Sequence, residues 1–165
     1  MKEEEKLVQI CVQNHNTIGS CESLTAGLFS STVASVPGAS AVLKGSVVTY
    51  ATEIKKKVVH VSEKLIGKYG VISKQCARMM ALNTQRILDV DYCVSFTGNA
   101  GPEAWEGKPA GRVYCAIASR EGNIKDFEFQ IDDKNRNEVR EQVVQEMIVH
   151  LIHTIEENEN GKKNS

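Results

Sequence analysis

The sequence predicts an α/β fold, a three-layer α/β/α sandwich with a mixed central sheet. Short apolar, β-branched runs alternate with helix-like segments through most of the 165 residues, the order typical of α/β proteins. Towards the end, two strand-like runs follow one another with only residues 119–123 between them. Such a pair is typical of a hairpin that makes an otherwise parallel sheet mixed.

The first half of the chain is expected to contain a helix, two strands and the helices between and after them. Leu7, Ile10 and Cys11 have the spacing of one buried helical stripe, and Pro37-Gly38 ends a later helix. The expected elements are helix Glu3–Asn14, strand Thr17–Cys21, helix Leu28–Val36, strand Val42–Tyr50, a helix capped by Thr52 through Val59, and helix Ser62–Tyr69.

The second half begins with a longer helix that starts at Ser73 and carries an apolar stripe to Ile87. The remaining expected elements are strand Tyr92–Phe96, a loop over Gly98–Pro109, strands Arg112–Ala118 and Ile124–Ile131, and a helix over Asn137–Ile155. A hydrophobic content of 41% and a charged content of 25% fit one globular domain with a sizeable core, which we place at residues 1–158. We expect a disordered polar tail over residues 159–165.

The segment Cys21–Gly27 is the first candidate for a functional site. It is a turn of small residues between a strand and a helix, with hydroxyls at Ser23 and Thr25. A helix N-terminus favours negative charge through its unpaired N–H groups and its dipole. Two interpretations stay open: a hydroxyl that only caps the helix, and one that takes part in chemistry or binds an anion.

Three segments are expected at strand ends: the Ser23 turn, the turn from Tyr50 to Lys55, and the segment Thr97–Pro102. Ligands of such sheets bind beyond the carboxyl ends of the strands. Convergence of the three segments would therefore build one pocket. The glycines of the third segment permit close backbone approach to a ligand.

Charge and cysteine usage exclude several classes of function. A net charge of −1 provides no global positive field for nucleic acid or an acidic membrane, so we expect neither as a partner. The five cysteines are odd in number and lack a C-x-x-C pair, which indicates reduced, buried thiols in a cytoplasmic protein. His150 and His153 share a helical face without a third ligand in sequence. We expect no metal and no cofactor.

Five ordered motifs resemble the CinA C-terminal-domain family. They are Glu-Ser-x-Thr-x-Gly at 22–27, Val-Pro-Gly-Ala-Ser at 36–40, Val-Thr-Tyr at 48–50 followed by Lys55, Thr-Gly-x-Ala-Gly-Pro at 97–102, and Lys-Pro-x-Gly at 108–111. The resemblance runs from about Lys6 to Ile155. The chain looks like the stand-alone form, without the molybdopterin-binding-like domain that precedes this one in many family members.

The resemblance implies a nicotinamide-nucleotide amidase, which converts the carboxamide of nicotinamide mononucleotide to nicotinate mononucleotide and ammonia, usually as a homodimer. By motif, Ser23 is the implied nucleophile, with Lys55 and Tyr50 as its implied catalytic partners. The residues implied to bind the nucleotide substrate are Glu22, Thr25, Gly27, Thr97, Gly98, Ala100, Gly101 and Arg136.

The chemistry suits these residue types. A serine hydroxyl needs a partner that takes its proton, and a lysine can do so only if its surroundings lower its pKa. We expect Lys55 in that role, Tyr50 to relay a proton or orient the lysine, and helix N-terminal amides near Ser23 to stabilise an oxyanion. Arg136 and Arg140 lie four residues apart and share a helical face, where either a phosphate or acidic neighbours would bind them.

Other interpretations stay open. Lys55–Lys57 is also a solvated charge run of which at most one or two members can face a pocket, and Thr97 also fits a simple turn hydroxyl. Asn99 and the segment 103–105 depart from the family pattern and leave the ligand preference open, and Trp105 either closes over a base or packs between copies. The alternative functions are a non-catalytic nucleotide- or partner-binding module and an amidase for a different amide.

Overall fold

The central strand β1 (Ile18–Glu22) is buried at every position, as expected of a strand covered on both faces. It pairs in parallel with β2 (Leu43–Val48) and with β3 (Tyr92–Gly98). Strands β4 (Arg112–Ser119) and β5 (Ile124–Gln130) continue the sheet in antiparallel fashion, giving the order β2-β1-β3-β4-β5. The computed structural model describes residues 1–163. The mixed sheet is therefore confirmed, including the C-terminal hairpin.

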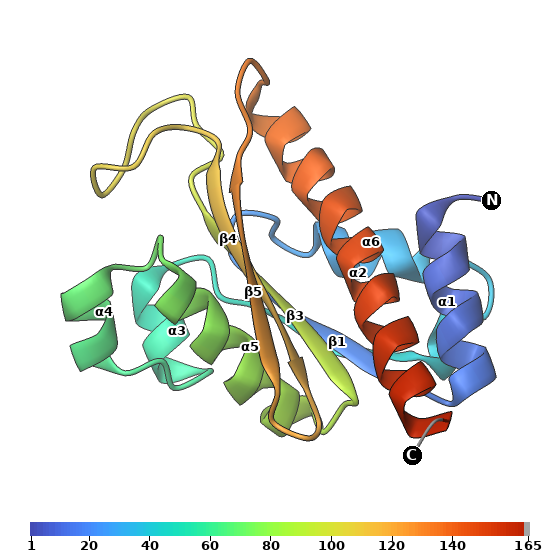
Figure 1. Cartoon of the computed structure of the whole chain (residues 1–165). Coiled ribbons are helices and arrows are strands. Elements are labelled where there is room, and N and C mark those ends of the chain that lie inside the picture. The colour runs from blue at the N-terminus through green and yellow to red at the C-terminus, as the bar shows by residue number, and fades with distance from the viewer. Residues whose placement is uncertain (164–165) are drawn as a thin grey trace.

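Helices cover both faces of the sheet (Figure 1). One face is covered by α1 (Glu3–Asn14), α2 (Leu28–Ala34) and α6 (Arg136–Lys163). The other face is covered by α3 (Thr52–Lys57), α4 (Glu63–Tyr69) and α5 (Lys74–Leu88). A short 3-10 helix, Ala39–Ala41, precedes β2. This arrangement confirms the predicted three-layer sandwich.

Each helical layer has its own apolar core against the sheet. The larger core joins α1, α2 and α6 to the sheet through side chains such as Leu7, Phe29 and Ile148. The smaller core lies under α3 to α5 and includes Ile72 and Met80. All five cysteines are buried and unpaired, as predicted.

Side-chain caps explain where two of the helices begin. The Ser62 hydroxyl accepts from the Leu65 N–H at 3.0 Å, and the Ser73 hydroxyl accepts from the Cys76 N–H at 3.1 Å, both as expected. The cap of α3 was predicted wrongly. Its N-cap is Ala51, which offers no side-chain acceptor, and Thr52 is already the first helical residue.

The last helix is longer than predicted, because α6 runs without a break from Arg136 to Lys163. Residues 159–163, expected in a disordered tail, are helical; residues 164–165 of that prediction lie outside the described residues. Extending an existing helix has a low cost per residue, and an ion pair between Lys162 and Glu159, three residues apart, supports the last turns.

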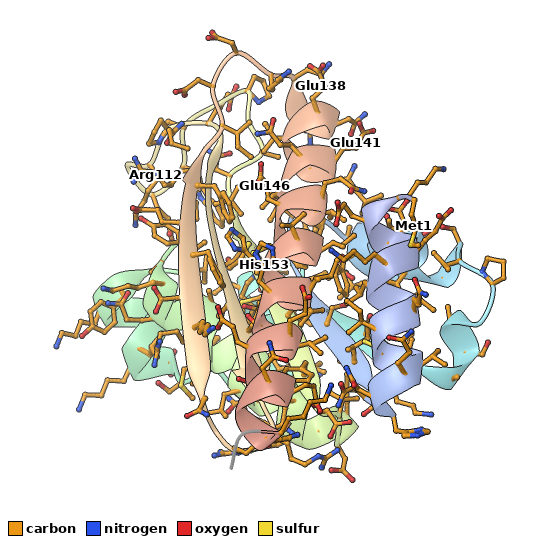
Figure 2. All side chains as sticks on the ribbon, turned by 45° about the vertical axis from the view of Figure 1, so that its right-hand side comes forward. Met1, Arg112, Glu138, Glu141, Glu146 and His153 are labelled. Atoms are coloured by element: carbon orange, nitrogen blue, oxygen red, sulfur yellow. The ribbon has the colours of Figure 1, made fainter. Side chains whose placement is uncertain are left out.

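The outward side of α6 is charged, and its inward side is apolar. Figure 2 shows Glu138, Glu141, Glu146 and His153 along this helix, and all four side chains are exposed. Val143, in contrast, is fully buried against the core. Within residues 1–163, no helix combines the length and apolar character that a membrane span requires.

The register of the parallel strands positions the site. Glu22, the last residue of β1, lies opposite Val48 of β2 and Phe96 of β3. The carboxyl ends of the three strands therefore meet at one edge of the sheet, and the segments that leave them converge there.

Candidate active site

A cavity of about 420 Å³ opens at this edge. It is bounded by Ser23 and Leu24, by Tyr50, by the loop segment 98–105 and by Arg136 at the start of α6. A volume of this size is within the range of small-molecule sites. The three segments that the sequence placed at strand ends therefore share one pocket region.

Ser23 and Lys55 are in direct contact beside this cavity. The Lys55 Nζ lies 2.9 Å from the Ser23 Oγ, a hydrogen-bonding distance. The Ser23 N–H donates to the Phe96 carbonyl at 2.9 Å, which ties the serine to the end of β3. Ser23 retains 8% exposure and lines the cavity, whereas Lys55 is 1% exposed behind it. The serine is thus the member of the pair that a ligand can reach.

Two backbone carbonyls hold the Lys55 amine in place. Its Nζ donates to the Thr49 carbonyl at 2.7 Å and to the Tyr50 carbonyl at 3.1 Å. Carbonyl oxygens can only accept, so a neutral amine must direct its two N–H bonds to them. In the structure the Nζ also donates to the Ser23 Oγ, and the Ser23 hydroxyl donates to the Tyr50 carbonyl at 3.3 Å. Once Lys55 loses a proton, its lone pair can face Ser23, whose hydroxyl can turn from the Tyr50 carbonyl to donate to it.

Burial in the protein interior lowers the pKa of Lys55 below its usual value of 10.5. Cys76, Cys21 and Glu106 act in the opposite direction. The two thiols themselves stay neutral near pH 7, because burial raises the pKa of Cys76 to about 12 and also raises that of Cys21. Glu106 is therefore the charge that opposes the effect of burial on Lys55.

Of the three consecutive lysines, only Lys55 is buried. Lys56 is partly exposed and forms an ion pair with Glu63 at 3.7 Å, and Lys57 is exposed. This difference follows from the rotation of about 100° between successive helical residues.

Tyr50 contacts Lys55 through its backbone and not through its phenol. The Tyr50 hydroxyl accepts from the Arg136 guanidinium at 2.6 Å, and a second nitrogen of Arg136 donates to the Gly101 carbonyl at 2.6 Å. Tyr50 is 54% exposed. The structure therefore brings the Tyr50 carbonyl, and not its hydroxyl, to the lysine.

Glu22 lies behind the site, outside the cavity. It is fully buried, and its carboxyl oxygens accept from the Phe29 N–H at 2.9 Å and from the Ser30 N–H at 3.1 Å at the start of α2. The Ser20 hydroxyl also donates to it at 2.7 Å. These contacts describe a helix cap with no oxygen directed to a ligand. They also occupy helix amides that we expected to stabilise an oxyanion at Ser23.

Thr25 and Gly27 shape the turn after Ser23 without lining the cavity. The Thr25 side chain is fully buried, and Gly27 is the N-cap of α2 with a φ of 97°, a conformation that disfavours other residues. Arg140 of α6 braces this turn, because its guanidinium donates to the Leu24 carbonyl at 2.8 Å and the Thr25 carbonyl at 3.1 Å. Arg140 therefore faces backbone carbonyls, although it lies on the helix one turn from Arg136.

The segment after β3 supplies the opposite wall of the cavity. Gly98, Ala100 and Gly101 line it, as predicted for a glycine-containing strand end. A side chain at Gly98 would meet the Arg112 carbonyl oxygen at 2.6 Å, so only glycine fits there. Thr97 is buried and donates its hydroxyl to the Val71 carbonyl at 2.7 Å, which supports the wall from behind.

Sequence reasoning missed Glu106. Its carboxylate accepts from the backbone N–H groups of Val71 and Ile72, at 3.0 and 2.8 Å, between α4 and α5. It thereby ties the long loop after β3 to the side of the molecule that carries Lys55. The only local signal was the pair Glu106-Gly107, which fits a tight turn.

In the described part of the chain, no three His, Cys, Asp or Glu side chains lie close enough together to hold a metal ion. His150 stacks on Phe127 with ring centroids 4.2 Å apart. Burial lowers the pKa of His150 below its usual value.

Comparison with known proteins gives a consistent result. Residues 1–155 match the CinA C-terminal domain. The chain is 35% identical over 154 residues to a competence-damage inducible protein of Listeria welshimeri, covering 93% of this chain and 37% of that protein. It is 43% identical over 121 residues to a protein of the same description from Geobacillus sp., covering 73% and 29%. The chain thus spans about a third of the length of these curated relatives.

Solved structures share the fold. The competence/damage inducible protein CihA from Agrobacterium tumefaciens superposes with a TM-score of 0.85 at 28% identity, covering 93% of this chain and 96% of that one. A CinA superfamily protein from Klebsiella pneumoniae 700603 superposes with a TM-score of 0.91 at 22% identity, covering 94% and 96%, and supports the fold alone. The family match, the curated relatives and the shared fold agree, and the chain belongs to the CinA C-terminal-domain family.

Proposed function

We propose that this chain hydrolyses the carboxamide of nicotinamide mononucleotide to nicotinate mononucleotide and ammonia, with Ser23 as nucleophile and Lys55 as general base. The observation that carries the proposal is the buried Lys55 Nζ at 2.9 Å from the Ser23 Oγ, beside an open cavity. A binding module has no need of a buried amine with a lowered pKa against a reachable hydroxyl.

The proposed reaction has two steps. Neutral Lys55 takes the hydroxyl proton while the Ser23 Oγ attacks the carboxamide carbon. The resulting ammonium gives that proton to the amide nitrogen as the C–N bond breaks, and the nitrogen leaves as ammonia. The acyl-serine ester is then hydrolysed by a water molecule that Lys55 deprotonates, and Lys55 returns this proton to the Ser23 oxygen as the C–O bond to Ser23 breaks. The products are a carboxylate and the regenerated hydroxyl.

The negative oxygen of the tetrahedral intermediate needs hydrogen-bond donors. The first amides of α2 that bind Glu22 do not serve, since they are already occupied. Leu24 and Ala100 both line the cavity, and within residues 1–163 neither backbone N–H donates a hydrogen bond. These two amides are the candidates for the oxyanion site.

Arg136 is the proposed contact for the nucleotide phosphate. Its guanidinium lines the cavity and already bridges Tyr50 to Gly101, so a phosphate would compete with these two acceptors. Bidentate binding of a phosphate by a guanidinium is stronger than a neutral hydrogen bond, which favours the exchange.

The test is release of ammonia from nicotinamide mononucleotide by the purified protein. Ser23→Ala and Lys55→Ala are expected to lower kcat by at least about a thousandfold. Tyr50→Phe, which keeps the carbonyl, is expected to lower kcat less than about threefold. The matched controls are Ser31→Ala and Lys57→Ala, because both side chains are exposed and make no hydrogen bond or ion pair in the described chain.

Three other results would contradict the proposal. Tight binding of the nucleotide without turnover would indicate a binding module. Hydrolysis of another amide, with no action on this nucleotide, would indicate an amidase of different specificity. Turnover that survives in both Ser23→Ala and Lys55→Ala would place the chemistry elsewhere.

The homodimer and the cytoplasmic location that accompany the resemblance belong to the same proposal. Sedimentation velocity tests the first, with a sedimentation coefficient for two chains expected. Fractionation of the producing cells tests the second.

A further inference from the structure

Trp105 is the only tryptophan in the chain, and it lines the cavity from a tight hairpin. The backbone N–H of Trp105 donates to the Lys108 carbonyl at 3.0 Å, and the backbone N–H of Lys108 donates to the Trp105 carbonyl at 2.9 Å. Between them, Glu106 and Gly107 have φ angles of 54° and 72°, the positive values typical of a two-residue turn of this kind. The backbone at Trp105 is thereby held by local hydrogen bonds.

Glu106 fixes this hairpin to the body of the protein. Its two carboxylate oxygens accept from the backbone N–H groups of Val71 and Ile72 at 3.0 and 2.8 Å. Lys108 lies 3.7 Å from the same carboxylate. Gly70 leaves the space for it, since a side chain there would meet the Glu106 Oε1 at 2.7 Å. The hairpin is therefore anchored at its turn as well as across its strands.

The anchoring contrasts with the exposure of the indole. Trp105 is 53% exposed, and Tyr50, which also lines the cavity, is 54% exposed. A large aromatic side chain that lines a pocket, is half exposed and stands on an anchored backbone can bind a planar ligand at a low cost in ordering.

We propose that Trp105 determines ring specificity in this cavity, because its indole face is a platform on which the positively charged pyridinium ring of the substrate stacks. Glu106 is the residue that positions Trp105. The proposal rests on the proposed function for the identity of the ligand. An indole face attracts a cation through its quadrupole and also stacks on a planar ring. The ring of nicotinamide mononucleotide is both cationic and planar, whereas the ring of its dihydro form is neutral.

Binding is tested in the Ser23→Ala background, where turnover does not interfere. Because the protein has one tryptophan, its fluorescence reports this residue alone. Saturation with nicotinamide mononucleotide is expected to quench the emission, since a pyridinium ring against an indole accepts an electron from its excited state. The dihydro nucleotide is expected to bind about tenfold more weakly.

Kinetics of variants with intact Ser23 separate the platform from the chemistry. Trp105→Leu is expected to raise the KM for nicotinamide mononucleotide about tenfold with kcat changed less than twofold, and Trp105→Phe to keep KM within about threefold of the wild type. Glu106→Gln retains one acceptor oxygen and is expected to raise KM about threefold. Glu141→Gln, on the outer side of α6, is the matched control and leaves KM unchanged.

The discrimination between the two nucleotides is the decisive readout. In the Ser23→Ala background, adding Trp105→Leu is expected to reduce the preference for the cationic ring about fivefold, which a merely structural loss would not do. Calorimetry measures this binding, because the variant has no tryptophan. Calorimetric binding without quenching would overturn the proposal. An unchanged KM in Trp105→Leu together with a changed oligomeric state would assign the indole to a contact between copies.

The outcomes also separate the two proposals. Hydrolysis without quenching contradicts the platform alone, and quenching without hydrolysis contradicts the amidase alone. Absence of both contradicts both.

Discussion

Lys55 shows how the surroundings of a single residue change its pKa. Its amine is almost completely buried, which opposes the charged form, and its partners are two carbonyls and one hydroxyl rather than a carboxylate. Burial therefore lowers the pKa of Lys55, and within residues 1–163 no carboxylate in direct contact counteracts that effect. Lys57, in contrast, is exposed to solvent.

Activity is expected to rise with pH as Lys55 loses its proton. In the proposed mechanism the neutral amine is the active form, so kcat/KM is expected to increase through the pKa of Lys55 in the free protein, at a pH below the usual 10.5. The measurement is kcat/KM over the pH range in which the protein stays folded. Lys57→Ala is the control and retains the wild-type profile. A profile that is flat, or that rises only near pH 10.5, would argue against Lys55 as the base.

At the scale of elements, the Ser23 turn is held from both ends. Glu22 caps α2 from the end of β1, and Arg140 holds the Leu24 and Thr25 carbonyls from α6. The Ser23 N–H is bound to β3. A nucleophile must be placed to well within an ångström of its attacking position. A turn held by three elements meets this demand better than a free loop does.

Glu22→Ala is expected to lower the free energy of unfolding by about 3 kcal/mol, since it leaves two buried N–H groups and the Ser20 hydroxyl without their acceptor. Urea unfolding followed by circular dichroism measures the change. Glu141→Ala, on an exposed helical face, is the control and changes the value by less than about 0.5 kcal/mol. A loss in Glu22→Ala no larger than that of the control would show that the cap does not stabilise α2.

At the scale of the whole molecule, α6 runs along the length of the layer that it shares with α1 and α2 (Figure 1). It carries Arg136 and Arg140 at the site, buried residues up to Ile155 in the middle, and exposed or partly exposed residues after that. Its two ends therefore serve different purposes: the first turns complete the cavity, and the last turns extend past the core.

Chain truncation is expected to separate these parts of α6. Ending the chain at Asn158 removes only exposed or partly exposed described residues and is expected to cost less than about 1 kcal/mol of unfolding free energy. Ending it at Leu151 also removes the buried Ile152 and Ile155 and is expected to cost at least about 3 kcal/mol. Urea denaturation of both truncated chains measures the difference. Equal losses would show that the final turns stabilise the core.

Patterns that are local in sequence predicted much of this molecule. Alternation of strands and helices indicated the sandwich, and the strand-end rule brought Ser23 and Lys55 into the same region. Other features depend on contacts between distant residues and leave no local trace. Lys55 is oriented by the backbone carbonyl of Thr49, and because every residue has such a carbonyl, the sequence does not mark this one. The hydrogen bond between Glu106 and Ile72 joins residues 34 positions apart. The length of α6 was missed because polar composition does not by itself end a helix.

The involvement of α6 in the Ser23 turn has a consequence for protein synthesis. The ribosome makes Ser23 and Lys55 before Arg136, which holds the cavity wall, and Arg140, which holds the turn. A nascent chain therefore carries Ser23 and Lys55 before the arginines that brace their surroundings exist. Under the proposed function, the site is complete only after the first turns of α6 have been made and have docked.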